Sequence, residues 1–170
     1  ALVREVHKPI TESHGYFIEG KFDQFQRAVP YFAILKAFEE MTNILLTESQ
    51  SVLDGFRISI QEAVGTEGKV ITDVIPQLEK IIGPQPPVPE VGGAEAQNRF
   101  NYVFRKLIHV LASKEHPLVL FIDDLQWADS SSLSLLQVLM TDRDSKHLLC
   151  ICAYRANEVS ASHPLAIPVG

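Results

Sequence analysis

Three short apolar or aromatic runs are separated by longer segments in which apolar residues recur at every third or fourth position. The runs are Gly15 to Phe22, Leu118 to Ile122 and Leu148 to Tyr154. Apolar runs without polar alternation are typical of strands buried on both faces of a parallel sheet, and the longer spacing is typical of amphipathic helices. The alternation therefore predicts an α/β fold in which helices cover a parallel sheet.

The segment from Glu95 to Ala112 has the most regular apolar stripe, which comprises Phe100, Val103, Phe104, Leu107, Ile108 and Leu111. This stripe predicts a helix that covers the sheet. Further helices are predicted from Pro30 to Leu46, with Pro30 in the first turn, and from about Ser51 to Val64. Another helix is expected after Asp129, with Leu133, Leu135, Leu136, Leu139 and Met140 as its apolar residues.

Prolines divide the remaining segments. Pro9 is expected to stop an initial helix over residues 1–8, and Pro76 divides the apolar pattern of residues 70–82 into two short helices. We therefore expect an inserted helical layer at about residues 30–83. The proline-rich connection over residues 83–93 is interpreted as a spacer, with a PxxP-type ligand as the alternative.

Composition and charge narrow the class of protein. With 46% hydrophobic and 21% charged residues in 170, the chain is one globular domain or part of one. A net charge of -6 argues against non-specific electrostatic binding to nucleic acid or to an anionic membrane. Cys150 and Cys152 lie within an apolar run and are interpreted as small core residues, which fits a reducing cytoplasm.

Two adjacent acids, Asp123 and Asp124, follow the apolar run that begins at Leu118. They are expected at the carboxyl end of a central strand, the edge where open α/β sheets bind ligands. A P-loop nucleotidase presents its Mg²⁺-binding acid in this way. One alternative is that the acids only form a turn or a helix cap. A haloacid-dehalogenase-like phosphatase would need Asp-x-Asp after this strand, whereas Asp123 and Asp124 are adjacent.

A phosphate loop of the form GxxxxGK[ST] does not occur in the sequence. The string Gly65 to Val70 has the wrong glycine spacing and a valine in place of the Mg²⁺-binding hydroxyl. It is interpreted as a turn between helices. Gly20-Lys21-Phe22 fails because a phenylalanine stands where the hydroxyl should be.

Four ordered motifs resemble the ATPase module of AAA/STAND-type signalling proteins. They are GYFIEGKFDQF at 15–25, QNRF at 97–100, FIDDLQWAD at 121–129 and AYRANEV at 153–159. The similarity is strongest to modules of large bacterial multidomain regulators, which combine serine/threonine kinase-like, GAF and histidine-kinase domains. It implies a P-loop NTPase-like three-layer α/β/α fold. In that family a helix like the one at residues 1–6 follows the phosphate loop directly, so the first strand and that loop are expected to be absent here.

The resemblance also implies roles for individual residues, with ATP and Mg²⁺ as cofactors. Asp123 resembles the acid that holds Mg²⁺ through water, and Asp124 the acid that orients or activates the attacking water. Arg155 resembles the sensor arginine that detects the γ-phosphate. Asp124 is one methylene shorter than the glutamate of many AAA relatives, which argues for slow hydrolysis. Gln126 and Trp127 fit the pattern without an assigned chemistry.

We therefore expect an ATP-dependent switch that acts on other domains of the same cytoplasmic regulator. A non-catalytic scaffold that retains the fold is the alternative. In the family's strand order, 5-1-4-3-2, the strands present would lie adjacent as 4-3-2, with Leu148 to Tyr154 at an open edge. An open apolar strand edge can pair with another chain, so self-association is expected. Because the phosphate loop is absent, the 170 residues alone are expected not to bind ATP measurably.

Overall fold

The computed structural model describes residues 2–159 and 163–165. Its helices are α1 (Leu2–Glu12), α2 (Phe32–Leu45), α3 (Gln50–Val64), α4 (Gly68–Thr72), α5 (Glu79–Ile82), α6 (Gly93–Leu111) and α7 (Ser130–Thr141). Its strands are β1 (Tyr16–Lys21), β2 (Leu118–Asp123) and β3 (Leu148–Cys152). Single 3-10 turns lie at 65–67, 76–78, 125–127 and 156–158.

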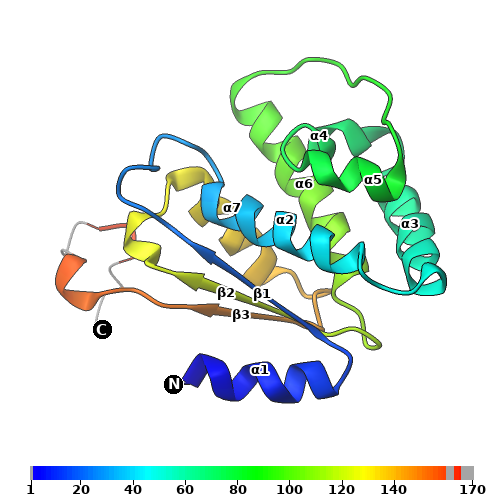
Figure 1. The fold of residues 1–170 in the computed structure, drawn as a ribbon. Coiled ribbons are helices and arrows are strands. Elements are labelled where there is room, and N and C mark those ends of the chain that lie inside the picture. The colour runs from blue at the N-terminus through cyan, green and yellow to red at the C-terminus, as the bar shows by residue number, and fades with distance from the viewer. Residues whose placement is uncertain (1, 160–162, 166–170) are drawn as a thin grey trace.

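The three strands form one parallel sheet in the order β1-β2-β3 (Figure 1). Lys21 pairs in register with Asp123, and Ile122 with Cys152, so the carboxyl ends of all three strands meet at one edge. Parallel neighbours need helical crossovers, which the intervening segments supply. The predicted α/β class, the parallel sheet and the adjacency of the three strands are confirmed.

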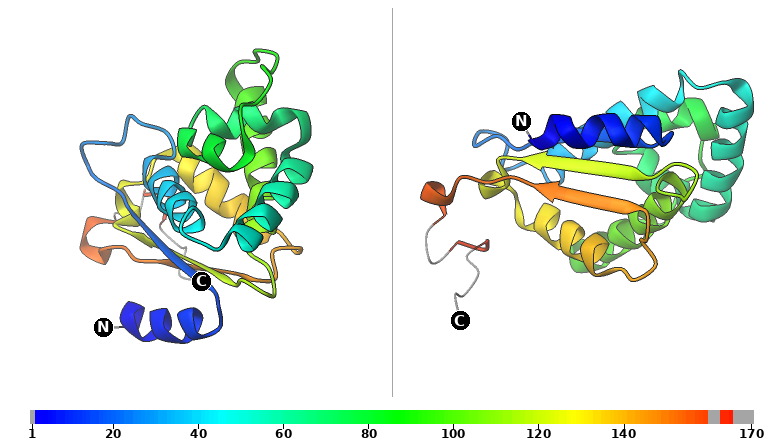
Figure 2. Two further views of the ribbon diagram at one scale, coloured as in Figure 1. Left: turned by 45° about the vertical axis from the view of Figure 1, so that its right-hand side comes forward. Right: turned by 90° about the horizontal axis from the view of Figure 1, so that it is seen from below.

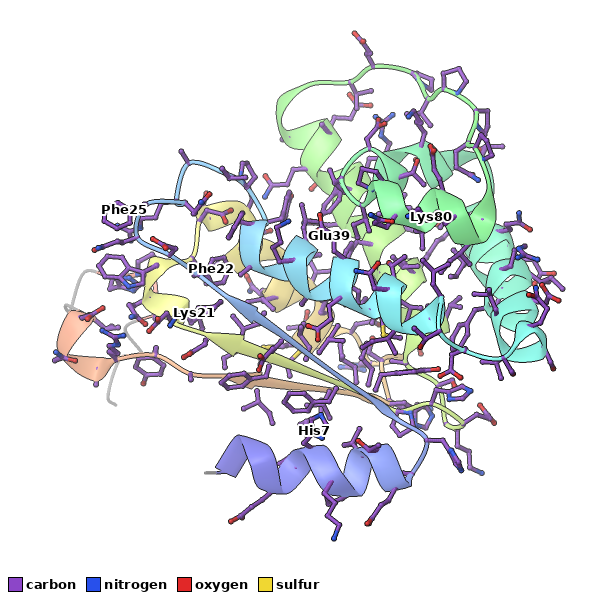
Figure 3. The ribbon with its side chains drawn as sticks, in the orientation of Figure 1. His7, Lys21, Phe22, Phe25, Glu39 and Lys80 are labelled. Atoms are coloured by element: carbon purple, nitrogen blue, oxygen red, sulfur yellow. The ribbon has the colours of Figure 1, made fainter. Side chains whose placement is uncertain are left out.

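Helices cover both faces of the sheet. α1 contacts β1 and β2 on one face, where His7 points toward the sheet and its ring lies 5.0 Å from that of Phe17 (Figures 2 and 3). On the other face, α2, α6 and α7 share a core that includes Phe38 and Phe104 (Figure 1). The layers are those of part of a P-loop NTPase-like α/β/α fold, as predicted.

The helices α3, α4 and α5 pack beside α6, away from the sheet (Figure 1). Gly65 ends α3 with a positive φ of 53°, which favours glycine. Pro76 begins its own 3-10 turn, so the predicted division of this region into short helices is correct. None of the helices within residues 2–159 has the length and apolar character needed to cross a bilayer.

Some expected element ends are wrong. Pro9 lies inside α1, because the Pro9 carbonyl still accepts the Ser13 N–H at 3.1 Å and the helix continues to Glu12. α2 begins at Phe32 rather than at Pro30, since Tyr31 before it is left-handed. Met140, an apolar residue of the helix expected after Asp129, is 66% exposed on α7. The ends of α1 and α2 and the exposure of Met140 depend on packing and local backbone geometry. The spacing of apolar residues does not determine either of these.

Candidate functional site

The two acids follow β2 directly, and the backbone turns sharply between them. Asp124 has a φ of 51° and a ψ of 43°, a left-handed conformation that aspartate adopts more readily than most residues. Its N–H donates to the Asp123 side chain at 2.9 Å. The chain then forms the 3-10 turn Leu125–Trp127. This local geometry directs the two carboxylates into different surroundings.

Asp124 is buried between two cations. Its carboxylate lies 3.3 Å from Lys21 Nζ, at the end of β1, and 3.3 Å from Arg155 Nε, which follows β3. Burial alone would raise the pKa of Asp124, but hydrogen bonds from Gln126 and Lys21 and the charge of Arg155 lower it below its usual value. The carboxylate is therefore ionised at neutral pH.

A closed set of side-chain contacts joins Asp124 to three other residues, and we call Asp124, Gln126, Glu158 and Arg155 the polar ring. Gln126 Nε2 donates to Asp124 Oδ1 at 3.2 Å and to Glu158 Oε2 at 2.9 Å. Arg155 Nη1 donates to Glu158 Oε1 at 3.1 Å and its Nε faces Asp124. The ring thus links the loop after β2 with the loop after β3.

A cavity of about 250 Å³ opens over the polar ring. It is lined by Lys21, Phe22, Asp23, Gln24, Phe25, Asp124, Trp127, Arg155 and Glu158. Figure 3 shows Lys21, Phe22 and Phe25 together at this end of the molecule. The side chains of Lys21 and Arg155 are 65% and 58% exposed, so both cations are accessible to an anionic ligand such as a phosphate group.

Asp123 lines a different hollow, of about 320 Å³, on the β1 side of the sheet, together with Glu19, Lys36 and Glu40. Lys21 lines both hollows. Within residues 2–159 and 163–165, no three acids, histidines or cysteines cluster closely enough to hold a metal alone. A single carboxylate nevertheless fits Mg²⁺, which usually keeps several waters and takes its other ligands from substrate phosphates.

Two residues of the FIDDLQWAD motif have structural roles. Asp129 caps α7 by accepting the Ser132 N–H at 2.9 Å, and it also accepts the Tyr31 N–H at 3.2 Å. The guanidinium of Arg27 lies over the Trp127 ring, with its central carbon 5.0 Å from the ring centroid. These contacts tie the 22–31 loop to the segment that follows the acids.

The structure brings Asp124 and Arg155 together and places Asp123 beside them at the same sheet edge. Sequence reasoning missed Lys21 and Glu158, and it left Gln126 without a role. Lys21 could have been found by asking which charged residue ends the strand next to the acids. Glu158 carries no such signal, because its position depends on the turn at residues 156–158.

Comparison with known proteins gives the family of the chain. The AAA ATPase domain family matches residues 1–151. The chain is also 41% identical over 124 residues to hybrid signal transduction histidine kinase G of Dictyostelium discoideum. That alignment covers 73% of this chain but only 4% of the relative. No solved structure matches the chain significantly. Because the family match spans most of the sequence, the chain belongs to the AAA ATPase domain family.

Proposed function

We propose that this domain binds ATP with Mg²⁺ and hydrolyses it slowly, as a nucleotide switch within a multidomain signalling protein. The observation that supports this most is the ionised Asp124, next to Asp123 and between the exposed cations Lys21 and Arg155 at the carboxyl edge of the sheet. Ligands of open parallel sheets bind at that edge. Family membership and the similarity to a hybrid histidine kinase support the same proposal.

Each acid has a separate role in this proposal. Asp123 would hold Mg²⁺ through water, and the metal, when bound, would neutralise charge on the phosphates. Asp124 orients or activates the attacking water. Arg155 detects the γ-phosphate, since its guanidinium is always charged and presents several donors.

The contacts of Asp124 also give a reason for slow turnover. A carboxylate that already pairs with two cations is a weaker proton acceptor than a free one, because both partners stabilise its charged form. A phosphate that attracts Lys21 or Arg155 would compete for those cations. Hydrolysis would then depend on how the nucleotide, or a neighbouring domain, rearranges them.

The test is Mg²⁺-dependent ATP binding by the full-length protein, measured by calorimetry with and without the metal. Asp123→Ala should abolish the difference made by Mg²⁺, because the carboxylate that would hold the metal is gone. Asp144→Ala is the control, since it removes an exposed aspartate from the turn between α7 and β3. This variant should bind ATP with the same Mg²⁺ dependence as the wild type. The same Mg²⁺ dependence in Asp123→Ala and wild type would contradict the proposal.

A non-catalytic scaffold is the second candidate. The polar ring supports it, because Asp124 finds its hydrogen-bond partners within the protein itself. A scaffold of this kind predicts that the full-length protein neither hydrolyses ATP nor changes its domain contacts with nucleotide. ATP turnover that is lost on changing Asp124 would exclude it.

A further inference from the structure

Gln126 has a buried polar side chain, with only 1% of the residue exposed. Its amide nitrogen donates to Asp124 and to Glu158, and its amide oxygen accepts the backbone N–H of Arg155 at 3.2 Å. A buried amide without partners would be costly, and these three hydrogen bonds remove that cost. The side chain therefore contacts every other member of the polar ring.

An amide is the side chain that these surroundings require. The two carboxylates can only accept and the Arg155 N–H can only donate, so the central residue must do both. Leucine would make none of the three bonds. Glutamate would keep an acceptor for Arg155 but place a third carboxylate between Asp124 and Glu158, where like charges repel.

The amide is also the part of the polar ring that water competes with least. The Arg155 side chain is 58% exposed, and exposed ion pairs hold a geometry weakly. Gln126 instead holds the Arg155 backbone from the buried side and holds Glu158, which in turn binds the guanidinium. The guanidinium is thus placed against Asp124 by contacts that begin at Gln126.

We propose that Gln126 is a positioning residue that fixes the sensor Arg155 against Asp124, through one bond to the Arg155 backbone and one to Glu158. This inference rests on the proposed function for the roles of Arg155 and Asp124. It adds a residue that links the loop after β2 with the loop after β3. Nucleotide binding at Asp123 and Asp124 is thereby transmitted to the position of Arg155.

The backbone of Gln126 has a separate structural role. Its carbonyl accepts from Arg27 Nη2 at 3.3 Å and contacts His163 Nε2 at 3.0 Å. Those contacts do not involve the side chain, so a substitution at this position leaves them in place. Replacing the side chain therefore separates positioning of Arg155 from support of the loop.

The first test is hydrogen exchange at the Arg155 amide in the full-length protein, followed by mass spectrometry of overlapping peptides. Gln126→Leu removes the acceptor of this amide, so we expect its exchange to be about tenfold faster. Gln137→Leu, the same change at an exposed position on α7, should leave it unaltered. Equal exchange in Gln126→Leu and wild type would overturn the proposal. Gln126→Met, unbranched and of similar length, replaces leucine if that variant does not fold.

The second test is a double-mutant cycle on kcat for ATP hydrolysis. Gln126→Leu should lower kcat by about 10- to 100-fold, with little change in KM, because the groups around the reacting phosphate are misplaced. Because Gln126 acts through Arg155, the double variant Gln126→Leu with Arg155→Lys should have the same kcat as Arg155→Lys alone. If the double variant instead loses kcat by the product of the two single fold-losses, the positioning role is overturned. If Arg155→Lys and Asp124→Asn keep wild-type turnover, the proposed function fails, and the exchange measurement alone decides the role of Gln126.

Discussion

Phe38 and Phe104 meet edge to face in the core, with ring centroids 4.9 Å apart and almost no exposed surface. Arg155 and Asp124 meet at the carboxyl edge of the sheet, where the arginine is mostly exposed. The first pair removes apolar surface from water and stabilises the fold. The second pair contributes less, because Asp124 loses hydration on burial and its partner Arg155 is open to screening by water and salt. Stability and the candidate chemistry therefore reside in different parts of the domain.

The largest effect on stability should come from Phe104→Ala. Phe104 is fully buried against Phe38 and Phe100, so truncation leaves a cavity and should cost about 3–5 kcal/mol of the free energy of unfolding. Met140→Ala is the control, since Met140 is largely exposed on α7, and should cost less than about 0.5 kcal/mol. Denaturant unfolding measures both. Equal midpoints would show that the core is not where stability resides.

Two glycines should respond in opposite directions to the same substitution. A methyl group at Gly20 would overlap the Ala33 carbonyl where α2 approaches β1, so Gly20→Ala should destabilise by about 1–3 kcal/mol. Gly55 lies within α3 with open space around it, so Gly55→Ala should stabilise by about 0.5–1 kcal/mol. Thermal unfolding distinguishes them. Stabilisation by Gly20→Ala would contradict the close approach of α2 to the sheet.

A smaller effect concerns Asp142, which follows α7 and lies 2.5 Å from His109 Nε2. Burial alone would raise the pKa of Asp142, but the Asp144 N–H and the contact with His109 lower it. Such a group stabilises the fold above the pKa of the unfolded chain, near 4, and loses this effect as the pH falls through the lower folded value. Stability of the wild type should therefore fall more steeply between pH 5 and pH 3 than stability of Asp142→Asn, as unfolding in urea at each pH can show. Parallel curves would contradict this assignment.

The smallest effect on stability should come from the polar ring itself. Glu158→Gln removes one charge from a partly exposed pair and should change the free energy of unfolding by less than about 0.5 kcal/mol. The same variant should still alter ATP turnover, since Glu158 holds the Arg155 guanidinium. A large loss of stability would contradict the division between core and polar ring.

Much of the fold could be predicted from residue pattern. Helix α6 and strand β2 follow from their apolar spacing, because burial of a stripe or a run requires that spacing. The predicted helix end at Pro9 is wrong, because proline lacks only its own N–H donor and the hydrogen bonds of the residues after it still form. Patterning is therefore informative about elements and weaker about their ends.

The candidate site was only half predictable. Asp123 and Asp124 could be named because they end a strand, and Arg155 because it resembles the family's sensor arginine. Lys21 ends the strand beside the acids and could have been named by asking which charged residue does so. Glu158 could not be named, since its contacts with the site depend on a turn after β3, which no local pattern contains.

The most direct test of the central claim is single-turnover ATP hydrolysis by the full-length protein carrying Asp124→Asn, with Asp144→Asn as the control. The asparagine keeps the shape of the side chain but cannot act on the attacking water. We predict a loss of about 100-fold or more in the hydrolysis rate, with ATP still bound, and no loss in the control. Turnover at the wild-type rate in Asp124→Asn would contradict the account.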